Sequence, residues 1–213
     1  MKFTDNTSGE NTKPAKILLQ YLGTGAFWIS AWLMLLFLLT GCAAHQRNYR
    51  ESINSSSNSF EDSREAYWKK TSALRDDLAK LNGQTDLTEA SRVAETAISY
   101  ADDLIAEYNL VRPPALHNVL VRIGAKDRGL CYHWTEDLMK RLQSLKLKTY
   151  QLHWGVAYRG SELKEHNTVV ITARGQAFEK GMVLDPWRNS GDLFWVPVEK
   201  DGYPWVERPQ GEM

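Results

Sequence analysis

The sequence predicts an α+β fold in which N-terminal helices and one further helix precede an antiparallel sheet. In the first half of the region after residue 58, apolar residues recur at three- and four-residue steps, which is typical of amphipathic helices. The second half holds short runs rich in Val, Ile, Tyr and Trp between Gly-containing turns, which is typical of strands. Because the helices come before the strands and do not alternate with them, the order favours α+β over a parallel βαβ arrangement.

The chain is predicted to have three parts, at residues 1–42, 43–58 and 59–213. Residues 17–39 carry no charged side chain, and about 20 apolar residues suffice to span a bilayer as a helix. Two lysines come just before this stretch, so its N-terminal side is expected to stay cytoplasmic. Residues 43–58 are polar and predict a flexible tether, which leaves one folded domain at residues 59–213.

The apolar stretch is followed at once by the tetrapeptide LTGC, which ends at Cys42. This tetrapeptide resembles the lipobox of bacterial lipoproteins, which implies cleavage before Cys42 and attachment of lipid to its thiol. Ala43 stands where an Asp would resemble an inner-membrane retention signal, so the resemblance implies the outer membrane, facing the periplasm. An uncleaved transmembrane helix with an incidental cysteine is the alternative.

Charge and cysteine content exclude several classes of protein. Without residues 1–42, the chain has 23 basic and 24 acidic residues, a balance that argues against a nucleic-acid partner. No His or Cys pair has the spacing of zinc ligands and no Gly-rich phosphate loop is present, so neither a metal nor a cofactor is expected. If Cys42 carries lipid, Cys131 is the only other cysteine and has no disulfide partner, so its role needs an explanation.

The helical patterns have identifiable ends. Helices are predicted over residues 60–81, 87–110, 115–123 and 131–146. The second is expected to begin at a cap formed by Thr85 or Thr88 and to end before two consecutive prolines. Gly124 is expected to follow the third helix as its C′ residue. The fourth helix begins at Cys131, where backbone N–H groups favour the thiolate over the thiol.

Strands are predicted over residues 149–158, 168–173, 182–184 and 193–198, with a hairpin connection at residues 174–181. His166 opens the second of these strands, and Asp185 closes the third. If the two strands pair through the hairpin, the start of one lies beside the end of the other, and these two side chains become neighbours. A thiol on a helix facing such a pair would complete a Cys–His–Asp arrangement of nucleophile, base and orienting carboxylate.

The segments RGLCYHW, EHNTVV and MVLDPW carry these three residues. In order and spacing they resemble the Cys, His and Asp motifs of the transglutaminase-like branch of the papain-like superfamily, over roughly residues 110–200. The resemblance implies that Cys131 is the nucleophile, His166 the base and Asp185 the residue that orients it. That family has a Trp upstream of the Cys that helps to form the oxyanion hole, but here the preceding Trp of the domain is Trp68, which is too early. Asn118 is the candidate for this donor.

Other histidines and aromatic residues have structural interpretations. His133 is two residues from Cys131 and so lies on a different face of the helix. His117 lies on the preceding helix, and His153 is expected to pack between aromatic residues within a strand. Trp154 and Trp187 are each expected to pack in the core in preference to lining a cleft.

Two classes of function remain open from the sequence. The first is a membrane-anchored cysteine-dependent amide hydrolase or acyl transferase in the cell envelope, which acts on a protein, a peptide or a peptidoglycan stem. The second is a non-catalytic binding or assembly lipoprotein that retains the same fold. An intact triad favours the first class, since a structural role requires none of the three residues to lie together.

Overall fold

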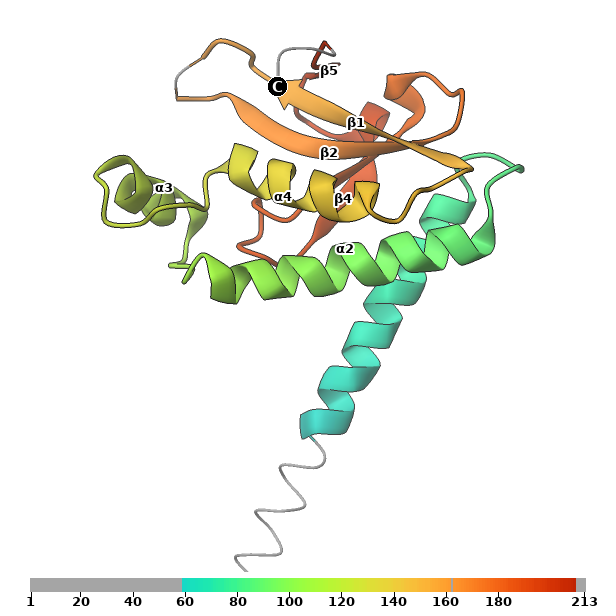
Figure 1. The fold of residues 1–213 in the computed structure, drawn as a ribbon, viewed down its shortest axis with the longest axis horizontal. Coiled ribbons are helices and arrows are strands. Elements are labelled where there is room, and N and C mark those ends of the chain that lie inside the picture. The colour runs from blue at the N-terminus through green and yellow to red at the C-terminus, as the bar shows by residue number, and fades with distance from the viewer. Residues whose placement is uncertain (1–58, 162, 210–213) are drawn as a thin grey trace, which may run out of the picture. The chain divides into compact units, whose positions relative to one another are not determined.

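The central element of the fold is a five-stranded antiparallel sheet with strand order β4-β3-β2-β1-β5 (Figure 1). The computed structural model describes residues 59–161 and 163–209. The strands are β1 (Tyr150–Ala157), β2 (His166–Ala173), β3 (Met182–Asp185), β4 (Phe194–Pro197) and β5 (Trp205–Glu207). Each neighbouring pair is antiparallel, so the predicted α+β class with an antiparallel sheet is confirmed.

Helices cover one face of this sheet in two layers (Figure 1). The helical elements are residues 59–79, α2 (Leu87–Glu107), α3 (Pro114–Arg122) and α4 (Cys131–Gln143). Helix α4 packs on β1 and β2, and α2 packs on the other side of α4. The main core lies between these layers, where α2 contributes four fully buried alanines whose small side chains permit close packing: Ala90, Ala94, Ala97 and Ala101.

The opposite face of the sheet is covered by short segments from the C-terminal part of the chain. Two 3₁₀ helices, η1 (Phe178–Lys180) and η2 (Val198–Lys200), contribute to a second apolar cluster with Trp205 of β5. Strand β2 therefore has all eight of its residues buried. Its pairing with β3, in which Val169 lies opposite Leu184, confirms the predicted hairpin connection at residues 174–181.

Several predicted boundaries were wrong by a few residues. Helix α2 is capped by Asp86, whose carboxylate accepts the N–H of Glu89 at 2.8 Å, and by neither Thr85 nor Thr88. It ends at Glu107 because the chain turns into a left-handed conformation at Asn109 (φ 46°). Helix α4 likewise ends at Gln143, three residues before Lys146 (φ 52°). Gly124 follows α3 with a φ of 77°, as predicted for a C′ residue.

Strand β5 was not predicted from the sequence. It has three residues, and only Trp205 among them is buried. A strand this short shows no alternation of apolar and polar residues, and its pairing with β1 depends on a contact that is distant in sequence.

The predicted anchor at residues 17–39, the lipidation site Cys42 and the tether at residues 43–58 lie outside the described residues. Among the helices that are described, none combines the length and apolarity needed to cross a membrane.

A buried carboxylate joins α2 to the start of the sheet. Glu89 is 8% exposed, and its carboxylate accepts hydrogen bonds from the backbone N–H groups of Lys148 and Thr149 at 2.7 and 2.8 Å and from the Thr149 hydroxyl at 2.6 Å. Burial alone would raise the pKa of Glu89, but these donors outweigh it and hold the pKa below its ordinary value. The ionised form is therefore the one that the fold stabilises.

Glu89→Gln is expected to lower the free energy of unfolding by about 1–3 kcal/mol at pH 7, because an amide cannot accept all three bonds. Since the folded pKa of Glu89 lies below the unfolded value, its contribution is present above about pH 4.3 and is lost as the pH falls through the folded pKa. Urea unfolding between pH 3 and 7 should show a steeper acid loss for the wild type than for Glu89→Gln. Glu95→Gln, an exposed carboxylate on the same helix, is the matched control; an equal effect of both substitutions would contradict the assignment.

Candidate active site

Cys131 is the first residue of α4, at the point where the chain changes from extended to helical conformation. The preceding residue, Leu130, has extended dihedrals, and Gly129 has a φ of 117°, which favours glycine. The thiol of Cys131 is half-buried, and its Sγ lies 3.8 Å from the carbonyl oxygen of Glu165, just before β2. The predicted placement of this cysteine at a helix N-terminus is therefore found.

Two buried histidines hold the turn that precedes Cys131. His117 accepts the N–H of Val111 on Nδ1 at 3.1 Å, so its Nε2 is the donor to the carbonyl of Arg128 at 2.8 Å. His133 accepts the N–H groups of Gly129 and Leu130 on Nδ1, at 3.1 and 3.2 Å.

Burial, assisted by the charge of Arg128, lowers the pKa of His133, which keeps the ring neutral and able to accept these bonds. Both histidines therefore have structural roles in placing Cys131.

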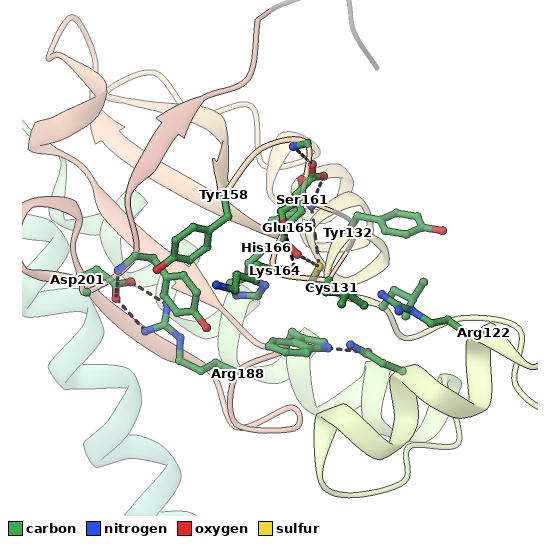
Figure 2. Close-up of a pocket in the computed structure, with 18 residues that line it drawn as sticks. Arg122, Cys131, Tyr132, Tyr158, Ser161, Lys164, Glu165, His166, Arg188 and Asp201 are labelled. Atoms are coloured by element: carbon green, nitrogen blue, oxygen red, sulfur yellow. Dashed lines mark hydrogen bonds and ion pairs between the residues drawn. The ribbon is translucent and has the colours of Figure 1, made fainter.

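The structure brings His166 and Asp185 into contact. His166 opens β2, Asp185 closes β3, and Nε2 of the imidazole donates to Oδ2 of the carboxylate at 2.6 Å. Both side chains are buried, at 3% and 0% exposure. His166 Nδ1 makes no hydrogen bond to any described residue. Because Nε2 is occupied by Asp185, Nδ1 is the nitrogen available to Cys131, whose sulfur lies beside the ring (Figure 2).

Burial on its own lowers the pKa of His166, but the hydrogen bond to Asp185 and the nearby Asp185 and Cys131 side chains outweigh this effect and raise the pKa to about 9. The imidazole is therefore protonated at neutral pH. A protonated imidazole between a carboxylate and a cysteine is the arrangement that a Cys–His pair uses in nucleophilic catalysis.

Asp185 is itself held by a second ion pair. Its Oδ1 accepts the backbone N–H of Arg188 and its Oδ2 accepts Nε of the same residue, each at 3.1 Å. The Arg188 guanidinium also donates two bonds to Asp201, at 3.1 and 2.8 Å (Figure 2). It lies over the rings of Phe194 and Tyr203. This network neutralises both carboxylates and fixes the one that holds His166.

Three aromatic rings surround the imidazole of His166. The centroids of Trp187, Tyr203 and Trp205 lie 4.7, 5.2 and 5.5 Å from that of His166. They restrict the orientation of the ring and reduce its contact with water. Trp187 packs against the apolar cluster around Trp134, as expected, and it also lines the pocket at the site. Trp154 packs against the main core, as expected.

A pocket of about 1020 Å³ opens over Cys131 and His166. It is lined by residues of α3, α4 and the β1–β2 connection, together with Tyr203 and neighbours before β5 (Figure 2). Asn118, the predicted oxyanion donor, lines this pocket, and its Oδ1 accepts the indole N–H of Trp187 at 3.2 Å. The Nδ2 group of Asn118 can therefore still act as a hydrogen-bond donor. A pocket of this size admits a peptide-sized group beside the sulfur.

His153 lies apart from this site, as predicted. It is buried within β1, where its ring nitrogens lie 2.6 Å from Glu207 Oε1 and 2.9 Å from Thr172 Oγ1, and its ring packs near Phe178. Within the described part of the chain, no group of three or more His, Cys, Asp or Glu residues is arranged to hold a metal ion.

Sequence reasoning missed three polar residues of the site: Asn167, Arg188 and Asp201. Asn167 directly follows His166 in β2, and its Nδ2 lies 3.9 Å from the Cys131 sulfur. Its position next to the candidate base was a usable signal, because the first residues of β2 lie at the same end of the strand as His166. Arg188 and Asp201 are 13 residues apart, and no sequence pattern joins them.

Comparisons of this chain with protein-family models, with curated proteins and with solved structures find no significant match.

Proposed function

We propose that the protein is a cysteine-dependent amide hydrolase or acyl transferase of the transglutaminase-like type. Cys131 is the nucleophile, His166 the base and Asp185 the residue that orients the base. The observation that carries the proposal is the buried imidazole of His166, which is bonded to Asp185 through one nitrogen and has the other available to Cys131. Cys131 starts α4, His166 starts β2 and Asp185 ends β3.

The chemistry follows from this arrangement. The Cys131 thiolate adds to a carbonyl carbon, so a C–S bond forms and the carbonyl π electrons move to oxygen. When the carbonyl re-forms, the C–N bond breaks, and the leaving amine takes the proton from the His166 imidazolium. A thioester on Cys131 remains. Neutral His166 then removes a proton from water or from an amine, whose oxygen or nitrogen forms a bond to the thioester carbon. The C–S bond breaks, the acyl group leaves on the new nucleophile, and the Cys131 thiolate and the His166 imidazolium are restored.

Trapping of the thioester tests this proposal directly. The full-length protein, purified in detergent, is expected to gain one acyl group from a p-nitrophenyl ester, and peptide mapping should place that group on Cys131. Cys131→Ala should gain none, and His166→Ala should acylate about 10²–10⁴-fold more slowly, because the positioned imidazole is lost. If the wild type gains no acyl group while its thiol remains accessible, the site is not catalytic, and the binding or assembly function takes its place.

The proposed setting is the cell envelope, with the domain tethered to a membrane through lipid on Cys42. Substrates within reach of such an anchor are proteins, peptides and peptidoglycan stems. Cys42→Ala is expected to abolish incorporation of labelled fatty acid and to block cleavage before residue 42, because the modified thiol is absent. An intact mass of the wild-type protein that corresponds to an unmodified full-length chain would instead establish the transmembrane alternative.

A further inference from the structure

A second buried polar side chain reaches the sulfur of Cys131. Asn167, the residue after His166, is 5% exposed, and its Nδ2 donates toward Cys131 Sγ at 3.9 Å. This distance is near the limit for a hydrogen bond to sulfur. When a substrate carbonyl carbon is bonded to this sulfur, the oxygen of that carbonyl would lie within ordinary hydrogen-bond reach of Asn167 Nδ2.

The orientation of the Asn167 amide is fixed by its other contacts. The indole N–H of Trp154 donates to its Oδ1 at 2.7 Å, so the oxygen and nitrogen of the amide are distinguished by their partners. The Nδ2 group carries two hydrogens; one is directed at Oε1 of Glu165, at 3.4 Å, and the other is directed at the sulfur. Glu165 is held in turn by the backbone N–H of Gly160 at 2.8 Å.

The alternation of side chains in β2 explains why both residues reach the same reaction centre. His166 and Asn167 are consecutive, so they lie on opposite faces of the sheet. His166 packs against Trp205 in the C-terminal cover, whereas Asn167 shares with Val169 the face that α4 packs on. The start of α4 places Cys131 at the end of this strand, where it receives the imidazole from one side and the amide from the other.

We infer that Asn167 is a catalytic residue that donates its amide N–H to the oxyanion formed on the substrate carbonyl when Cys131 attacks. The backbone N–H of Cys131 at the start of α4 is the second donor. This inference rests on the proposed function, since only an acyl-transfer reaction forms such an oxyanion. It assigns the oxyanion donor to Asn167 in place of Asn118, which the sequence had suggested.

The two asparagines form a natural comparison. Each has its Oδ1 bonded to a tryptophan indole, Trp154 for Asn167 and Trp187 for Asn118, and both line the pocket. Only Asn167 has its amide nitrogen directed at the sulfur. Comparing substitutions of the two residues therefore separates loss of the oxyanion donor from the general effect of removing an asparagine amide from the pocket.

Two reactions of the same thiol separate an oxyanion donor from a structural residue. Acylation by a p-nitrophenyl ester passes through an oxyanion, whereas alkylation by iodoacetamide is a displacement at carbon that forms none. Both rates are measured on the full-length protein in detergent at one pH. The ratio of acylation to alkylation is expected to fall about 10²–10³-fold in Asn167→Ala. Asn167→Asp, which keeps an acceptor for the Trp154 indole, should show a similar fall. Asn118→Ala should keep the wild-type ratio.

Three results would overturn the inference. If both rates fall together in the Asn167 variants, so that the ratio is unchanged, Asn167 only maintains the structure around Trp154. If the ratio falls in Asn118→Ala and not in the Asn167 variants, Asn118 is the donor. If wild-type Cys131 is alkylated but never acylated, the proposed function fails, and the inference fails with it; in the first two cases the proposed function stands.

Discussion

At pH 6, Cys131 is expected to react with iodoacetamide about 10- to 100-fold faster than a free thiol. A free cysteine with a pKa near 8.5 is only about 0.3% thiolate at that pH. His166, whose pKa is raised to about 9, is protonated at pH 6, so a positive charge lies beside the sulfur at that pH. This charge is expected to assist attack by the sulfur on iodoacetamide.

His166→Ala should slow alkylation at pH 6 about 10- to 100-fold, because the positive charge beside the sulfur is lost. Asp185→Asn should have a smaller effect, roughly 3- to 10-fold, because Asp185 acts on the thiol only through the imidazole. His153→Ala, a buried histidine elsewhere in the sheet, is the control and should leave the rate unchanged. His133→Ala is unsuitable as a control, since His133 holds the turn before Cys131.

Two outcomes would contradict this prediction in different ways. If Cys131 is alkylated only after denaturation, it is an inert buried thiol and the enzymatic proposal falls. If it reacts rapidly but is indifferent to His166→Ala, the thiol is exposed and the assignment of the base is wrong.

Gly129→Ala is expected to lower the free energy of unfolding by about 3–5 kcal/mol. Gly129 has a φ of 117°, where an L side chain is strained, and an added Cβ would lie 2.1 Å from Nε2 of His117. His117 cannot move away cheaply, because its Nε2 bonds the carbonyl of Arg128 in the turn and its Nδ1 bonds the N–H of Val111 before α3. Since this turn places Cys131, the surviving folded protein should also show slower alkylation at pH 6.

Gly124→Ala is the matched control for this substitution. Gly124 has a φ of 77° but no atom within 4 Å of an added Cβ, so it should cost only the backbone strain of about 1–2 kcal/mol. Urea unfolding measures the loss of unfolding free energy caused by each of the two substitutions. In a His117→Ala background the cost of Gly129→Ala should fall to that of Gly124→Ala, because the clash is gone. Equal costs of the two glycine substitutions in the wild-type background would show that the turn accommodates a side chain.

The local patterns of the sequence were sufficient to predict most of the helices and strands. Leu138 and Leu142 recur at helical spacing, and both are fully buried on the face that α4 turns to the core. The hairpin at residues 174–181 was visible from its two Gly-containing ends, and the pairing that it implied was enough to make His166 and Asp185 neighbours. Such inferences succeed because periodicity and turn chemistry act between residues that are close in sequence.

One prediction failed for a local reason: Asp86 and two nearby threonines have similar propensities to cap a helix, and the position of the first helical turn selects Asp86. Other features were not predicted because they depend on contacts between distant segments. The bonds of Arg188 to Asp201 and of Trp154 to Asn167 join segments that only the folded sheet brings together. Lipidation of Cys42 lies outside the described residues and stays a prediction.

Local patterns in the sequence were enough to predict the α+β class, the order of helices and strands, and the strand pairing that makes His166 and Asp185 neighbours. The surroundings of the thiol depend on tertiary contacts: His117 and His133 hold the turn before Cys131, and Asn167 lies beside the sulfur. These contacts could not be predicted because an amide or imidazole acquires its role from the direction in which its donors and acceptors point, and packing between distant segments sets that direction.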